Sequence, residues 1–361
     1  MPQGYRYVKI GKPYFRVRQN PVVLAWLLWT KNRSLRLDSL GLGRRQALLA
    51  VKSLVRHQLV QRSSDSSLVL PVCGNFCLSV HRGYRVFKLR CQTVVRTFDA
   101  GVDPAIVAGE IEGVRRASLV ECAPAILDWS IEGRWYEEHF VAGSRAFVIA
   151  QSDPAAFREM YVRDIEPCLE RMMLLRAPLR VNLGDHVDKA RHTLGDRKLS
   201  ELSRDARKVD KIQRFINSVV DLLYAEGDRE IDLVFSHGDF SLRNILMTEK
   251  GMMVIDWESV GCRSALFDLY NCFLTELYYG RAATNLVSEI DQAILSLQSR
   301  LASKAPDIAR TLPSLAQAYR RLYYLERIQM LVERDPGDSL LRTILRSIDV
   351  FTRHEEAVAV S

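Results

Sequence analysis

Hydrophobic periodicity divides the chain into a strand-rich first part and a helix-rich second part. Short apolar runs separated by turns occupy residues 73–100 (NFCLSV, GYRVFKLR, TVVRTF) and recur at 125–131 and 134–140. Helical spacing is found at 104–118 and then dominates at 153–176, 198–226, 265–280, 283–303, 308–334 and 338–353. The pattern therefore predicts strands first and helices afterwards, the two being largely segregated along the chain.

One block interrupts the helical part. Residues 231–258, IDLVFSHGDFSLRNILMTEKGMMVIDWE, read as an apolar strand that leads into a polar loop, followed by a hairpin that turns at 249–251. The loop carries His237, Asp239 and Asn244, and the hairpin delivers Asp256 to a strand end, with Glu258 two residues further on. Since carboxylates and an amide converge at strand ends here, we expect the chemistry of the protein in this block.

The spacing of these residues suits phosphoryl transfer. That reaction needs positioning and charge neutralisation more than covalent work from the protein. One carboxylate must face the acceptor hydroxyl, and a carboxylate with an amide oxygen must hold Mg²⁺, which prefers hard oxygen ligands. Asp-x₄-Asn, with a second Asp after a hairpin, supplies that set.

The two halves of the block also resemble a known family. HGDFSLRN followed by VIDWE is similar to the paired signature H-G-D-x₄-N and D-x-E/D of the aminoglycoside phosphotransferase and choline kinase superfamily, relatives of the protein kinases. The resemblance implies an α+β, two-lobed protein-kinase-like fold, with a β-rich N-lobe at 73–142 and a helical C-lobe at 143–361. It also implies an enzyme that uses ATP and Mg²⁺ to phosphorylate an alcohol group.

Roles in the C-lobe follow from this resemblance. Asp239 is expected to act as the catalytic base or to orient the hydroxyl, His237 to brace the catalytic loop, and Arg243 to belong to the same catalytic group. Asp268, in SALFDLYN, matches a family position and is expected to be structural. The implied metal-site residues are Asn244, Asp256 and Glu258.

The resemblance extends to the nucleotide-binding residues of the N-lobe. Gly83 lies in a turn expected over the phosphates, and Arg96 stands on the third strand where a Lys is commoner. The helix partner of Arg96 is expected to be Glu110, with Glu112 as the alternative, since residues two apart on a helix cannot share one face. Lys88 is a competing phosphate ligand if the strand register differs.

The segment RWYEEHFVAG resembles the hinge of the family. Backbone groups of Glu138, His139 and Phe140 are then expected to face adenine, and Gly143 to loosen the link that follows. An ordinary edge strand remains the alternative interpretation of these residues.

Composition adds a separate feature at the N-terminus. The chain is 361 residues long with a net charge of +8, and its 48% hydrophobic content excludes a disordered protein. Residues 1–62 contain 13 Lys or Arg and a single acid, Asp38, whereas the remainder is mildly acidic. Residues 1–72 are therefore predicted to be a basic N-terminal extension, beginning with an extended arm at 1–20.

The order helix (21–30), turn, helix (44–58), hairpin (59–61 with 68–70) resembles a winged helix. Three roles for the extension stay open: nucleic acid binding through residues 21–70, packing on the N-lobe, and contact with an anionic membrane surface or phosphorylated glycan. The apolar run at 21–29 is too short to span a bilayer, and the first 20 residues lack the apolar core of a signal peptide, so a cytoplasmic protein is expected.

The function predicted from the sequence is phosphorylation of a hydroxyl on a small molecule or glycan, such as a sugar, an amino alcohol or an aminoglycoside-like acceptor. The helices at 265–353 mix acidic residues with many arginines, so no acidic pocket for a cationic drug is indicated. The alternative is a pseudokinase regulator whose basic N-terminal module binds nucleic acid.

Overall fold

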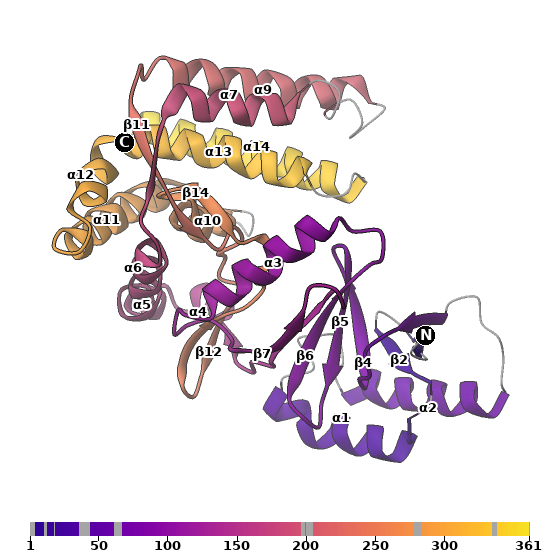
Figure 1. Cartoon of the computed structure of the whole chain (residues 1–361). Coiled ribbons are helices and arrows are strands. Elements are labelled where there is room, and N and C mark those ends of the chain that lie inside the picture. The colour runs from indigo at the N-terminus through magenta and orange to yellow at the C-terminus, as the bar shows by residue number, and fades with distance from the viewer. Residues whose placement is uncertain are drawn as a thin grey trace. The chain divides into compact units, whose positions relative to one another are not determined.

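The computed structural model describes residues 4–10, 13–17, 19–35, 44–60, 67–195, 199, 205–277, 283–333 and 338–360 (Figure 1). It divides the chain into two compact units. Unit 1 comprises Met1–Arg145 and Leu246–Ile255, and unit 2 comprises Ala146–Ile245 and Asp256–Ser361.

Unit 1 is built on an eight-stranded antiparallel sheet (Figure 1). Its strands, in spatial order, are β3 (Ser67–Leu70), β1 (Tyr5–Lys9), β2 (Tyr14–Arg16), β4 (Phe76–Val80), β5 (Gly83–Lys88), β6 (Thr93–Phe98), β8 (Trp135–His139) and β7 (Ile126–Ser130). The strands predicted at 73–100, 125–131 and 134–140 are thereby confirmed.

Successive strand side chains point to opposite faces of this sheet and create two cores. On one face, Phe76, Phe87 and Val94 pack beneath helices α1 (Pro21–Leu35) and α2 (Arg44–Val60). The helices contribute Leu24, Leu27, Leu28, Ala47, Ala50 and Leu54 to that core. The adjacent residue on each of the three strands lies in the core of the opposite face, namely Cys77, Val86 and Val95.

The N-terminal extension is therefore part of the N-lobe sheet, and two predictions about it are wrong. Residues 5–9 and 14–16 form a strand pair rather than an extended arm. The hairpin of a winged helix is not formed either, because residues 59–60 complete α2 and β3 pairs with β1, with Tyr7 opposite Leu68. The apolar run at 68–70 is too short to specify its partner strand by itself. It pairs with β1, whose edge is otherwise free on that side.

Unit 1 also contains the helix α3 (Pro104–Ala117), as predicted at 104–118. Asp103 caps it by accepting a hydrogen bond from the Ala105 N–H at 2.8 Å, and Pro104 occupies the first turn, where its missing N–H costs nothing. A separate three-stranded sheet joins β9 (Ser144–Arg145) to the hairpin of β12 (Ile245–Thr248) and β13 (Gly251–Val254).

Unit 2 is mainly helical, with a small antiparallel sheet at its centre (Figure 1). The sheet has the order β10 (Leu179–Asn182), β11 (Glu230–Ser236), β14 (Gly261–Ser264). The helices are α4 (Ala146–Ser152), α5 (Pro154–Met160), the π-helix η2 (Tyr161–Ile165), α6 (Glu166–Leu174), α7 (Leu183–Leu194), α9 (Ala206–Tyr224), the 3₁₀ turn η3 (Trp257–Ser259), α10 (Phe267–Leu277), α11 (Ala283–Leu301), α12 (Pro306–Ser314), α13 (Ala316–Val332) and α14 (Asp338–Val360).

Two helices of unit 2 differ from the sequence pattern. The single helix predicted at 308–334 is two helices, α12 and α13, which meet at Leu315 just after Pro313. The helix α7 was not predicted at all, although Asn182 caps its first turn. Within the described residues, no helix is both long enough and apolar enough to cross a membrane.

Candidate active site

The loop after β11 carries the central residues of the site. A carboxylate at the start of α10, Asp268, accepts hydrogen bonds from the backbone N–H groups of His237 (2.7 Å) and Gly238 (3.0 Å). Burial raises the pKa of Asp268, and the nearby His237 and Arg263 oppose this by favouring the charged form. Through these two hydrogen bonds, Asp268 fixes the backbone of the loop at His237 and Gly238.

Gly238 is required by this geometry. Its φ is +81°, in the left-handed region, and a Cβ there would overlap the backbone oxygen of Ser259. The same Cβ would lie 2.8 Å from a guanidinium nitrogen of Arg263, which packs behind the loop. Any larger residue would displace the chain next to Asp239.

His237 ties the loop to the segment after β13. Its Nδ1 accepts the Asp239 N–H at 3.1 Å, so Nδ1 carries no proton. The buried ring lies 4.5 Å from the Trp257 ring and 6.0 Å from the Phe240 ring. Asp239 and the Asp256–Glu258 segment are thus connected through one rigid side chain.

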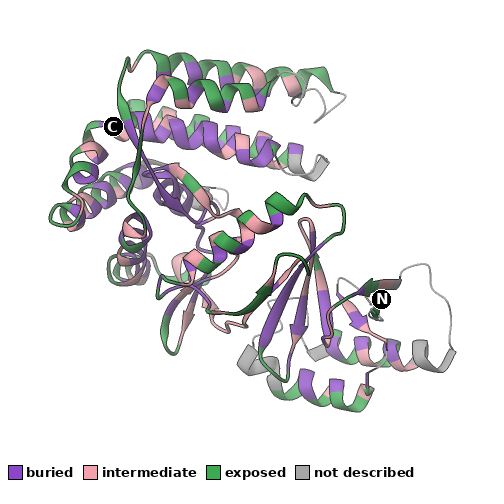
Figure 2. Ribbon diagram, in the orientation of Figure 1, coloured by how far each residue is buried: buried purple, intermediate pink, exposed green. Residues whose placement is uncertain are grey.

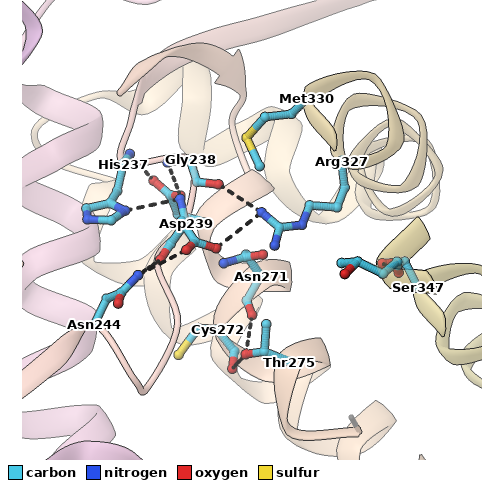
Figure 3. Close-up of polar contacts among 12 residues, drawn as sticks. His237, Gly238, Asp239, Asn244, Asn271, Cys272, Thr275, Arg327, Met330 and Ser347 are labelled. Carbon is cyan, nitrogen blue, oxygen red and sulfur yellow. Dashed lines mark hydrogen bonds and ion pairs between the residues drawn. The ribbon is translucent and has the colours of Figure 1, made fainter. Parts of the chain in front are cut away.

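The Asp239 carboxylate is held from two sides (Figure 3). Asn244 Nδ2 donates to Asp239 Oδ2 at 3.1 Å and to the Asp239 backbone oxygen at 2.9 Å. Arg327 Nη1 forms an ion pair with Asp239 Oδ1 at 3.2 Å and donates to the Gly238 backbone oxygen at 3.3 Å. The carboxylate therefore has a fixed orientation while its side chain keeps 28% exposure.

Arg327 is a residue of the site that the sequence pattern did not predict. It lies on α13, far along the chain from the loop, and its side chain is only 12% exposed. The sequence signal is an arginine within the otherwise largely apolar run YYLERIQMLV, but no spacing links it to Asp239. Only the packing of α13 beside the loop brings the two charges together.

The predicted metal-site residues offer oxygen atoms. Because Nδ2 is the donor in both Asn244 hydrogen bonds, Asn244 Oδ1 is the atom that can accept a cation. Asp256 begins η3 in the left-handed conformation (φ 74°), a strained geometry that clusters at functional sites, and Glu258 lies in the same short helix. This set of hard oxygen donors fits Mg²⁺, which is commonly held by one or two carboxylates together with substrate phosphates.

No group of three or more His, Cys, Asp and Glu side chains is arranged as a metal site in the described part of the chain. Arg243, expected with the catalytic residues, has an exposed side chain whose guanidinium lies 4.8 Å from the centre of the Phe147 ring. Its catalytic role stays a prediction.

In unit 1, the expected pair of Arg96 and Glu110 is present and buried. Arg96 Nε lies 3.3 Å from Glu110 Oε1, and the two side chains are 1% and 7% exposed. Glu112, the alternative partner, pairs instead with Arg115 and Arg116 at the surface. The pair of Arg96 and Glu110 is therefore a buried ion pair and not a contact of the protein surface.

The other donors of Arg96 are also engaged. Nη1 donates to the Thr97 oxygen at 2.9 Å, and Nη2 donates to the His81 oxygen at 2.5 Å. Since His81 begins the turn that contains Gly83, Arg96 holds this turn in place. The competing ligand Lys88 pairs with Glu137 at 2.7 Å, and β5 and β6 are in the register that puts Arg85 opposite Arg96.

The segment Glu138 to Phe140, expected to be the hinge, does not lie on an edge strand. Glu138 lies opposite Val94 of β6 on one side and Ile126 of β7 on the other, so β8 is an internal strand. The N–H groups of His139 and Phe140 donate to backbone oxygens of Ala125 (3.3 Å) and Gln92 (2.9 Å). Adenine recognition by these residues stays a prediction, and their two N–H groups are already used within the protein.

Comparison with known proteins agrees with this geometry. A model of the phosphotransferase enzyme family matches residues 151–323, which include the loop, the hairpin and Arg263. The match covers just under half of the chain, and this part of the chain is therefore similar to phosphotransferase enzymes. The curled antiparallel sheet and the helical part have the kinase-like fold.

One solved structure has the same fold at low sequence identity, and others are similar to this chain. A choline kinase from Cryptosporidium parvum Iowa II is 14% identical, with 80% of this chain and 88% of that chain covered at a TM-score of 0.52. A choline/ethanolamine kinase family protein from Mesorhizobium loti is 17% identical, with 81% and 92% covered at a TM-score of 0.45. No curated protein matches the sequence of this chain.

Proposed function

We propose that this protein moves the γ-phosphate of ATP, with Mg²⁺, onto a hydroxyl of a small molecule or glycan. The observation that carries the proposal is the Asp239 carboxylate, oriented by Asn244 and Arg327 yet still open to solvent. A hydroxyl that binds this carboxylate is held in one direction, which is the main contribution a protein makes to phosphoryl transfer.

Asp239 carries the chemistry in this proposal. One of its oxygens accepts a hydrogen bond from the acceptor hydroxyl and takes its proton as the new O–P bond forms and ADP leaves. The contacts from Arg327 and Asn244 hold the carboxylate in one direction, so its main effect is to orient the hydroxyl. Bound Mg²⁺ would neutralise the phosphate oxygens, and Asn244, Asp256 and Glu258 are the residues proposed to hold it.

The N-lobe residues are proposed to serve the nucleotide. Arg96 positions the turn of Gly83 through the His81 oxygen, and Glu110 holds Arg96 in turn. Phosphates that approach this turn meet a backbone fixed by a buried cation. The segment Glu138 to Phe140 is proposed to face adenine, as in the family.

The acceptor class is proposed from the relatives and from the residues at the site. The solved neighbours include choline and ethanolamine kinases, a glucosamine kinase and a complex of gentamicin with an aminoglycoside phosphotransferase. Sugars, amino alcohols and aminoglycosides therefore form the screen. Arg327 next to Asp239 places a positive charge beside the bound hydroxyl, which disfavours an acceptor whose ammonium groups adjoin that hydroxyl.

Substitution of Asp239 tests the proposal. Asp239→Ala is expected to abolish phosphate transfer from ATP while the thermal shift produced by ATP with Mg²⁺, and reversed by EDTA, persists. Asp210→Ala is the matched control, because Asp210 is an exposed carboxylate with an ion-pair partner on α9. Full turnover by Asp239→Ala, with an acceptor that the wild type phosphorylates, would refute the assignment.

A further inference from the structure

The outer side of α1 exposes large apolar side chains. Val22, Trp26 and Trp29 recur at the i, i+4, i+7 spacing of one helix face and are 73%, 60% and 66% exposed. The opposite side of α1, with Leu24, Leu27 and Leu28, is buried against the sheet of unit 1. Both sides of the helix are therefore apolar, and the core explains only one of them.

The neighbouring helix α2 continues this feature. Leu48 and Leu49 are 56% and 54% exposed, and Lys52, one helical turn further on, is exposed beside them. Ala47 and Ala50 of the same helix are buried on the sheet. We define the tryptophan face as the exposed residues Val22, Val23, Trp26 and Trp29 of α1 and Leu48, Leu49 and Lys52 of α2. Figure 2 shows that both helices carry exposed as well as buried positions.

The N-terminal segment that carries the tryptophan face is strongly basic in sequence. Residues 1–62 contain 13 Lys or Arg and one acid, and α1 and α2 have no acidic residue in their described first turns. Scattered single apolar residues are normal on a protein surface, but two tryptophans and several aliphatic residues on one face are not. Exposed Trp among Lys and Arg is typical of helices that lie in the headgroup region of an anionic bilayer.

The charge decides between possible occupants. A second copy of the chain would bring the same basic surface against itself, and this like-charge contact opposes a dimer through this face. Nucleic acid would satisfy the basic charge, but its phosphates gain nothing from exposed Val and Leu side chains. An anionic lipid surface satisfies both properties, since it offers negative headgroups above an apolar interior.

We propose that the tryptophan face docks this protein peripherally on an anionic membrane surface, with Trp26 and Trp29 inserted at the headgroup level. The proposal is independent of the acceptor and of the catalytic roles given above. It locates unit 1 at the bilayer and requires no membrane-spanning helix.

Vesicle flotation of the full chain tests the proposal. The wild type is expected to float with vesicles of phosphatidylcholine and phosphatidylserine, to release them at high salt, and to ignore phosphatidylcholine alone. Trp26→Ser with Trp29→Ser is expected to weaken binding more than about tenfold, because apolar burial scales with the area inserted. Lys52→Ala is expected to weaken it about fivefold, the effect of one basic residue near an anionic surface.

Trp129→Ser is the matched control, because Trp129 is an exposed tryptophan of unit 1 outside the tryptophan face. It should bind vesicles as the wild type does, and every variant should keep a cooperative thermal unfolding transition, which shows that the fold is retained. Equal flotation of the double Trp variant overturns the proposal. So does a wild type that ignores anionic vesicles and instead dimerises, or binds DNA in a salt-sensitive way, through the same residues.

Discussion

Replacement of Arg327 by Met gives the sharpest test of the site. Met keeps an unbranched apolar stem but removes the guanidinium that contacts Asp239 Oδ1 (3.2 Å) and the Gly238 oxygen (3.3 Å). Hydrogen bonds to charged groups contribute about 1.5–3 kcal/mol. Because 1.36 kcal/mol corresponds to a tenfold change in rate, kcat should fall by about 10- to 100-fold if that energy positions the carboxylate for transfer.

The kinetic signature separates positioning from a general loss of structure. Arg327→Met should lower kcat while the KM for ATP stays nearly constant, because the variant changes the position of the Asp239 carboxylate and not the nucleotide-binding residues. Arg327→Lys should restore part of the rate. Steady-state turnover with an acceptor found in the screen, or ATP hydrolysis without one, measures both quantities.

Arg321→Met is the control for this experiment. Arg321 lies on the same helix, is 11% exposed and pairs with Glu226 at 2.9 Å, but has no contact with the loop in the described interactions. It should lose stability but keep the wild-type kcat. An unchanged kcat in Arg327→Met, or the same fall of kcat in Arg321→Met, would refute the reasoning.

Three further outcomes follow from the structure. Burial lowers the pKa of His354 to about 3, whereas the same group in the unfolded chain has a pKa near 6.5, so between these values only the unfolded chain binds a proton. The free energy of unfolding should therefore fall by about 2 kcal/mol from pH 7.5 to 5, and by much less in His354→Gln. Urea denaturation at both pH values measures the difference. Gly238→Ala should inactivate the enzyme because its Cβ meets backbone, whereas Gly227→Ala, at φ +78° in open space, should cost only about 1 kcal/mol in denaturation and keep full turnover. Arg96→Lys should raise the KM for ATP, since a single ammonium cannot maintain all three guanidinium contacts; an unchanged KM would show that the Gly83 turn does not serve the nucleotide.

The strands and helices that follow strict periodicity could be predicted, and the failures have physical reasons. The strands at 125–131 and 134–140 and the helix at 104–118 depend on local alternation, turns and an N-cap, all of which are contained in a few neighbouring residues. The partner of β3 was mispredicted because pairing depends on which sheet edge is free, not on the strand itself. The break between α12 and α13 and the helix α7 were missed for a related reason, because tertiary packing decides weak local preferences.

For the site, the sequence by itself determined the reacting groups. The signature His237-Gly238-Asp239, with Asn244 five residues after Asp239, sets its own geometry, because a tight loop with a left-handed glycine brings neighbouring polar atoms within hydrogen-bond distance. The tertiary structure decided what lies around them. It placed Arg327 of a distant helix on the carboxylate, buried Arg96 on Glu110, and joined the basic N-terminal residues to the sheet with an apolar face left outward. Local spacing fixes contacts over a few residues, whereas contacts across the chain depend on which buried faces pack together, and no single segment contains that information.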